Sequence, residues 1–305
     1  MVSNSSLNAS SAVTADASSD LILMVTLFQG LPGVRYACFA ALLLIYSATM
    51  LANLTLALVI CLESSLRRPM FLLMALLSAT DAVETTNLLP RIMANLVSRD
   101  SHVTVPECIA QMFFVHTGIR LQSFILTSNV RVLRALLASV ALATLPIFGY
   151  VAVASGLRYC RPMVTSSPNC DITIIGSLSC GDLYPSVIFT YVNIVTGIAL
   201  PLLLVVAMYG LVFADLRRRR AGPSERSHRK AVHTCLSHLF VVAVFFAFIA
   251  FTFINGLNLY TIPRDVRFPL QILQYVVPPA LNPVVYGLRT AEIRRAFVRL
   301  VTRRV

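Results

Sequence analysis

The sequence is poor in charged residues. Asp, Glu, Lys and Arg make up only 12% of its 305 positions, and Lys230 is its single lysine. A soluble domain usually has about twice that charged fraction, so a soluble protein is not expected. Instead, 57% of the residues are hydrophobic and the mean hydropathy is +0.78. This composition predicts a protein that crosses a membrane several times, and we attribute the shortage of lysine to compositional bias.

Acidic residues are also scarce, at 13 against 25 basic ones, which gives a net charge of +12. Such a balance can indicate a nucleic-acid partner. Here the arginines cluster at the ends of apolar runs and do not interleave with aromatic residues, so nucleic-acid binding is not expected.

The sequence lacks a catalytic constellation. His228, His233, Cys235 and His238 are close in sequence, but His233 is two residues from Cys235 and points elsewhere on a helix. There is no carboxylate pair and no nucleophile elbow, so neither an enzyme nor a cofactor is expected. A transporter is an alternative, against which stands the lack of an inverted repeat and of paired broken helices.

Seven apolar runs are long enough to cross a membrane as helices. They cover about residues 36–62, 70–96, 108–127, 135–154, 187–213, 229–257 and 269–288. We therefore predict an all-α membrane protein with a seven-transmembrane helix bundle at residues 36–288. Residues 1–35 are expected to form a disordered extracellular tail. Residues 289–305 are expected to form a short amphipathic helix on the inner leaflet, with one apolar face made by Ile293, Phe297, Leu300 and Val301. A disordered basic tail is the alternative there.

The basic residues predict the orientation of the bundle. With the N-terminus outside, the inner segments contain 17 basic residues, the outer segments contain 6, and Arg91 and Arg120 lie within spans. This asymmetry places the C-terminus in the cytoplasm. The outer tail has two glycosylation sequons, at Asn4 and Asn8. No basic n-region precedes an apolar segment at the start, so the first membrane helix is expected to direct insertion.

The second span contains three charged residues, Asp81, Glu84 and Arg91, which are costly inside a membrane and are therefore functional candidates. Glu84 and Arg91 are seven residues apart and can be bridged only through a third group. The simpler interpretation of Arg91 is that it reaches toward the outer surface.

Four of the seven cysteines lie in polar connecting segments on the predicted outer side: Cys108, Cys160, Cys170 and Cys180. Their even number fits two disulfides in an oxidising compartment. Spacing alone leaves all three pairings open.

Four motifs, in order along the chain, resemble those of one family. They are LRRPMFLLMALLSATD at 66–81, PECIAQMFFVH at 106–116, KAVHTCLSH at 230–238 and PALNPVVYGLR at 279–289. The chain is similar to the odorant (olfactory) receptors, a branch of the rhodopsin-like G-protein-coupled receptors, and among these to the fish type.

This resemblance implies a plasma-membrane receptor for small odorants that signals through a stimulatory heterotrimeric G protein. It implies disulfides from Cys108 to Cys170 and from Cys160 to Cys180. It also places Asp81 in an interior sodium site. The family has a glutamate at the position of Gln122, so the neutral amide removes one charge from that site.

The chain departs from the family between residues 123 and 134. An Asp-Arg-Tyr-type motif and the loop after it are absent, and about twenty residues are missing relative to the family pattern. Arg131 and Arg134 are the nearest substitutes for the arginine that restrains the sixth helix. We expect either poor coupling or an altered product of a receptor gene.

The ligand pocket is expected in the outer half of the bundle, among the third, fifth, sixth and seventh spans. Its candidate residues are Met112, His116, Ile119, Asn193, Thr196, Phe246, Ala250, Phe253, Leu257 and Gln274. The alternative for His116 is a bond to a neighbouring helix, and for the aromatic stripe it is simple packing. The span at 229–257 is expected to move on activation, and the candidate G-protein contacts are Arg131, Arg134, Arg217, Arg218 and Lys230.

Overall fold

The computed structural model describes residues 23–25, 32–67, 69–98, 102–127, 133–159, 163–165, 170, 175–176, 179–181, 184–219, 239–252 and 263–302. Eleven of the residues singled out in the sequence lie outside these ranges: Asn4, Asn8, Arg131, Cys160, His228, Lys230, His233, Cys235, His238, Phe253 and Leu257. The backbones of Arg134, Arg217 and Arg218 are described, but their side chains are not.

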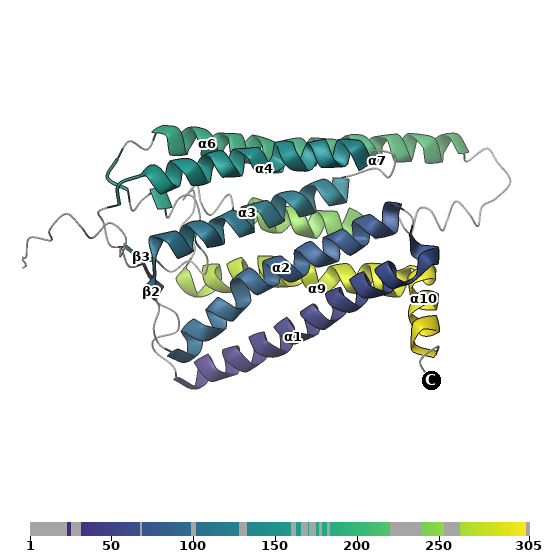
Figure 1. Cartoon of the computed structure of the whole chain (residues 1–305), viewed down its shortest axis with the longest axis horizontal. Coiled ribbons are helices and arrows are strands. Elements are labelled where there is room, and N and C mark those ends of the chain that lie inside the picture. The colour runs from purple at the N-terminus through teal and green to yellow at the C-terminus, as the bar shows by residue number, and fades with distance from the viewer. Residues whose placement is uncertain are drawn as a thin grey trace, which may run out of the picture.

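The described part of the chain is a bundle of long helices that run side by side (Figure 1). In chain order these are α1 (Pro32–Leu62), α2 (Pro69–Ser98), α3 (Val105–Thr127), α4 (Leu133–Gly156), the continuous rod of α6 (Tyr184–Ile194), η2 (Val195–Ala199) and α7 (Leu200–Arg219), a helix at Leu239–Thr252, and α9 (Arg264–Arg289). The seven rods follow the seven predicted spans. The fold class is therefore confirmed as an all-α seven-transmembrane bundle.

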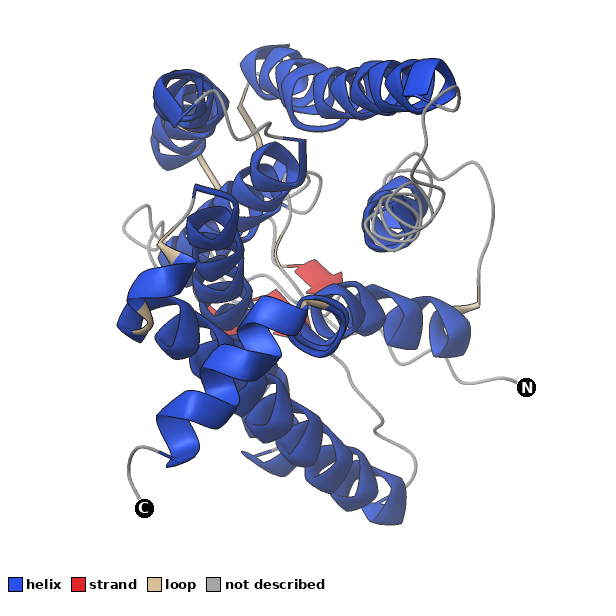
Figure 2. Cartoon of the chain, turned by 90° about the vertical axis from the view of Figure 1, so that its right-hand side faces the viewer, coloured by secondary structure: helices blue, strands red, loops and turns tan. Residues whose placement is uncertain are grey.

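A short helix, α10 (Ala291–Thr302), lies across one end of the bundle (Figure 2). Its Ile293 and Ala296 are buried against the bundle, while Phe297 and Val301 are about half exposed. Arg299 Nη2 pairs with Glu63 Oε1 at 3.1 Å, just before the 3-10 helix η1 (Ser64–Leu66) that follows α1. The expected amphipathic helix is thus present, with part of its apolar face directed away from the protein.

The opposite end of the bundle, here called the disulfide end, contains a small sheet. Its strand β1 (Leu23–Val25) pairs antiparallel with β2 (His102–Val103) and parallel with β3 (Met163–Thr165). Cys108 at the start of α3 is bonded to Cys170 in the loop after α4, as the resemblance implies. Cys180 is also disulfide-bonded, while its expected partner, Cys160, lies outside the described residues.

The structure differs from the expected organisation near the N-terminus and in the fifth span. Leu23–Val25 forms a strand inside the segment expected to be disordered, because two other segments offer their edges for pairing. The first helix begins at Pro32, a residue suited to a first helical turn, and not near residue 36. The fifth rod contains a π-helical turn, which apolar periodicity does not reveal.

Two described helices, Gly33–Leu62 and Val187–Ala207, are by themselves long and apolar enough to cross a membrane. The helix α9 contains four prolines and still runs without a break from Arg264 to Arg289. Pro283 has no N–H to give to the carbonyl of Pro279, four residues before it. The buried side chain of Asn53 on α1 replaces it, since its Nδ2 donates to Pro279 O at 2.9 Å. This bond joins the first and last rods and satisfies a backbone group that water does not reach.

Replacing Cys108 by serine is expected to lower the stability of the folded protein by about 2–5 kcal/mol, because the start of α3 is no longer tied to the loop after α4. Thermal unfolding of the detergent-purified protein measures the effect. Cys61→Ser is the matched control, since Cys61 is an exposed free cysteine. Equal melting temperatures for the two variants would contradict a structural role for the Cys108–Cys170 bond.

Candidate functional site

A buried polar cluster lies between α2, α3 and α9 and consists of Asp81, Glu84, Gln122 and Asn282. The Nε2 group of Gln122 donates to Asp81 Oδ1 at 2.8 Å and to Glu84 Oε2 at 2.6 Å. Asn282 Nδ2 donates to the other oxygen of Asp81, Oδ2, at 2.8 Å. A single amide group therefore bridges two carboxyl groups and uses both of its hydrogens to do so.

Gly118 explains why Glu84 fits against α3. It precedes Gln122 by one helical turn, and a Cβ atom added to it would lie 3.3 Å from Glu84 Oε2. Any larger side chain here would compete with the carboxyl group for space. Gly118 and Gln122 thus form one surface of α3 that is complementary to the acidic surface of α2.

Glu84 also changes the charge of the interior site. The resemblance predicts one acid fewer than in the family, because Gln122 replaces a glutamate. In the structure the second carboxyl group comes from the opposite helix, through Glu84, one turn from Asp81. Arg91 does not bridge to Glu84 and instead pairs with Glu107 Oε2 at 3.5 Å, with about a third of its side chain exposed.

The cluster offers oxygen ligands of the kind that hard cations prefer. Besides the two carboxyl groups, the cluster contains the amide oxygen of Asn282, which is buried and has no hydrogen-bond partner within the described ranges. The amide oxygen of Asn53 on α1 is also buried without such a partner. Among the same residues there is no group of three or more His, Cys, Asp or Glu side chains placed to hold a metal ion. A bound cation would therefore depend on carboxyl and amide oxygens together.

The expected ligand residues of α3 are buried or partly buried. Met112 is buried in an apolar cluster with Cys108, Tyr150 and Ile175. His116 is partly buried, and its Nδ1 lies 2.9 Å from Met112 O, so its own helix supplies a partner. The assignment of Met112, His116 and Ile119 to a ligand pocket stays a prediction.

Arg120 is a buried residue that the candidate set from the sequence omits. Its guanidinium group donates to both the side-chain and the backbone oxygen of Asn193 on α6. It also lies against Gly197 in the π-helical turn η2, where an added Cβ would be 3.4 Å from Arg120 Nε. Its position within a span was the available signal, since a charged residue at that depth is a functional candidate.

The remaining ligand candidates occupy different surroundings. Gln274 on α9 is buried and accepts a hydrogen bond from Thr252 Oγ1. Phe246 packs in an apolar cluster with Val242 and Ile249 that continues to Ile293 of α10, whereas Ala250 is exposed. Thr196 donates to Val192 O within its own helix. None of these contacts tests ligand binding.

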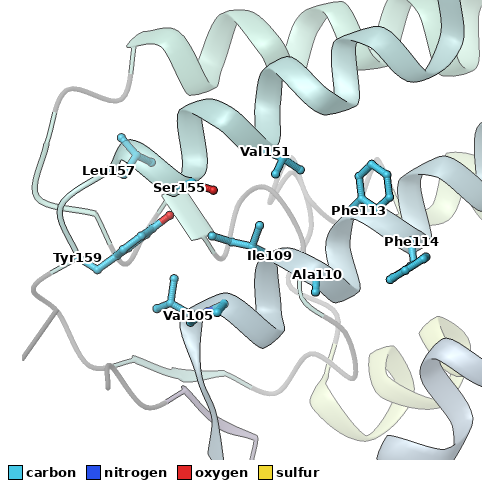
Figure 3. A pocket seen from close by; sticks show the side chains of 10 residues that line it. Val105, Ile109, Ala110, Phe113, Phe114, Val151, Ser155, Leu157 and Tyr159 are labelled. Carbon is cyan, nitrogen blue, oxygen red and sulfur yellow. The ribbon is translucent and has the colours of Figure 1, made fainter. Parts of the chain in front are cut away.

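A cavity of about 510 Å³ lies between α3 and α4 at the disulfide end (Figure 3). It is lined by Val105, Pro106, Ile109, Ala110, Phe113, Phe114, Val151, Ser155, Leu157 and Tyr159. None of the expected ligand residues is part of this lining.

The arrangement of the helices and the disulfide is typical of one class of membrane protein. The described part of the chain has seven helical rods, a helix across one end, a disulfide from the third rod to the loop after the fourth, and a buried polar cluster. These are the features of a rhodopsin-like seven-transmembrane receptor. The crystal structure of squid rhodopsin matches with a TM-score of 0.65 and 12% sequence identity, covering 90% of this chain and 89% of that one. At this identity the likeness shows the fold alone.

The sequence comparisons are more specific. The family model described as olfactory receptor matches residues 42–304. Human olfactory receptor 6N1 is 30% identical over 297 residues, which cover 90% of this chain and 93% of that protein. Human olfactory receptor 52D1 is 29% identical over 93% of this chain and 96% of its own length. The chain belongs to the olfactory receptor family, and it is accordingly a multi-pass protein of the plasma membrane and not an enzyme.

The contacts in the polar cluster predict that substitutions at Glu84 and Gln122 have coupled effects on the stability of the folded protein. Gln122→Glu alone places a third carboxyl group beside two others and removes their shared donor, and it is expected to cost about 3–5 kcal/mol. Adding Glu84→Gln restores one amide and two acids, now with the acid on α3, so most of the stability should return. Thermal unfolding of the two single variants and the double variant measures this coupling. Additive effects would show that the two positions are independent.

Proposed function

We propose that the chain is an odorant receptor that binds small organic ligands in the half of the bundle nearest the disulfide end. The pocket would lie among α3, the α6 rod, the helix Leu239–Thr252 and α9. The observation that supports it best is the presence of polar side chains on all four of these helices within otherwise apolar surroundings, namely His116, Asn193 with Arg120, and Gln274 with Thr252. Such a mixture of apolar walls and few polar groups is typical of small-molecule sites.

The α10 end is the proposed cytoplasmic surface that contacts a stimulatory heterotrimeric G protein. The excess of basic residues in the segments assigned to this end supports the orientation. Arg131, Arg134, Arg217, Arg218 and Lys230 are the proposed G-protein contacts. The disulfide end then faces outward, with Asn4 and Asn8 as glycosylation sites, and the exposed apolar residues of α10 contact membrane lipid.

A coupling-defective family member is the second candidate, and one observation favours it. The helix α3 ends at Thr127 and α4 begins at Leu133, which leaves only five residues between them. The segment that in the family contains the Asp-Arg-Tyr-type motif is therefore absent. A receptor without it would still fold and bind ligand but would transmit little to a G protein.

We also propose that Asp81 and Glu84 hold a sodium ion, with the amide oxygens of Asn53 and Asn282 as further ligands. Two carboxyl groups so close together favour an added positive charge between them. The unpartnered amide oxygens support the same interpretation.

A cAMP assay separates the two candidate functions. The full-length chain is expressed with the stimulatory olfactory-type G protein and exposed to a panel of small odorants, with surface labelling as a control for delivery. A second chain has a family-length third-helix end restored after Ser123. We expect a ligand-evoked signal from both, several-fold larger in the restored chain. A response from the restored chain alone would establish the native chain as coupling-defective, and equal responses would show that the missing segment is unimportant.

Sodium binding is expected to raise the melting temperature of the purified protein when sodium chloride replaces choline chloride at equal ionic strength. Glu84→Gln should remove most of this shift because it removes a ligand charge. Glu107→Gln is the matched control, since that carboxyl group lies outside the cluster and is partly exposed. If sodium changes the melting temperature equally in the unchanged protein, Glu84→Gln and Glu107→Gln, the ion binds elsewhere or not at all.

A further inference from the structure

The cavity between α3 and α4 has one polar end and one apolar end (Figure 3). Ser155 and Tyr159 lie at the end next to the loop, and Phe113 and Phe114 lie at the other end, with Ile109, Ala110 and Val151 between them. From Val105 to Phe113 the wall of α3 extends for about 12 Å. The volume of 510 Å³ is within the range of about 300–1,000 Å³ that small-molecule sites occupy.

Several residues of the cavity wall are exposed, which indicates an opening toward the surrounding lipid. They are Ala110, Phe114 and Ser155, and Phe148 on the neighbouring surface of α4 is exposed as well. Cys108 and Met112 of α3, by contrast, are fully buried. A molecule would therefore enter from the leaflet next to the disulfide end.

The polar groups of the lining are hydroxyls, and none of its ten residues is charged. The Tyr159 hydroxyl donates to Ala154 O and keeps its lone pairs available to accept. Burial raises the pKa of Tyr159 to about 12, so the phenol is neutral at physiological pH. The loop that positions it is held by the backbone bond from Cys180 N to Arg158 O at 2.9 Å.

We propose that this cavity binds one sterol molecule from the surrounding lipid leaflet. The single hydroxyl of the sterol would lie at Ser155 and Tyr159, and its rigid ring system would pack along Ile109, Ala110 and Val151 toward the two phenylalanines. A phospholipid fits less well, because its charged headgroup would find no charged partner in the lining. This site is separate from the proposed odorant pocket and beyond the proposed function.

Photolabelling of the full-length protein in lipid nanodiscs tests the proposal. The probe is a photoactivatable cholesterol, and the labelled peptides are mapped by mass spectrometry. Labelling should concentrate on residues of the cavity wall in α3 and α4, and excess cholesterol should compete for it whereas excess phosphatidylcholine should not. Labelling spread evenly over the lipid-facing helices, or equal competition by phosphatidylcholine, would overturn the proposal.

Matched variants test the site itself. Ala110→Phe fills the cavity from α3 and should reduce labelling at least about tenfold, as should Val151→Phe from α4. Ala207→Phe makes the same change at an exposed position of α7 and should leave labelling unchanged. Thermal unfolding confirms that each variant is folded, and unchanged labelling in a folded Ala110→Phe or Val151→Phe variant would refute the site.

The proposed contact between the sterol hydroxyl and Tyr159 can be tested separately by competition measurements. Tyr159→Phe keeps the aromatic wall and should weaken competition by cholesterol about fivefold, the loss expected for one hydrogen bond. Competition by cholestane, which lacks the hydroxyl, should not change. An equal loss for both competitors would contradict the proposed orientation of the sterol. None of these measurements depends on odorant or G protein, so their failure is distinguishable from failure of the proposed function.

Discussion

The interior of this bundle depends on one constraint: polar groups that water does not reach must find partners on other helices. The Gln122 amide is the clearest example, because it donates hydrogen bonds from α3 to two acids of α2. Asn282 extends the connection to α9 through the second oxygen of Asp81. The same constraint explains Asn53, whose side chain replaces the backbone donor that Pro283 lacks. These bonds determine which faces of α1, α2, α3 and α9 meet, whereas apolar packing alone would allow several rotations.

Much of the fold is predictable from the sequence because it follows from one-dimensional properties. Apolar runs predict the seven rods, and the distribution of arginine predicts the proposed orientation. The strand at Leu23–Val25 is different, since its partners lie at residues 102–103 and 163–165 and pairing over such distances has no local signal. The π-helical turn at Val195–Ala199 has no clear pattern in the sequence either.

The polar cluster shows where prediction from the sequence stops. Asp81 and Glu84 are recognisable from the sequence as charged residues within an apolar span. The sequence relates Glu84 to Arg91, two helical turns away, and does not reveal the contact with Gln122. The rotation of α3 against α2 determines which residue bridges the two acids. This rotation depends on both helices and cannot be read from either one alone. Gly118 would have been a useful signal, because a glycine one turn from Gln122 indicates a close approach.

The helix α3 connects these observations because each of its faces has a different neighbour. Gly118 and Gln122 contact the acids of α2, Met112 packs in the apolar cluster with Tyr150 and Ile175, and Ala110 and Phe114 line the cavity. All of these residues precede Ser123, whereas the segment missing relative to the family follows it. The missing segment therefore does not include the parts of α3 that contact the acids of α2 or that belong to the proposed ligand pocket. We therefore expect ligand binding and G-protein coupling to be separable in this chain, because in the proposed function only coupling requires the end of α3 that is short here.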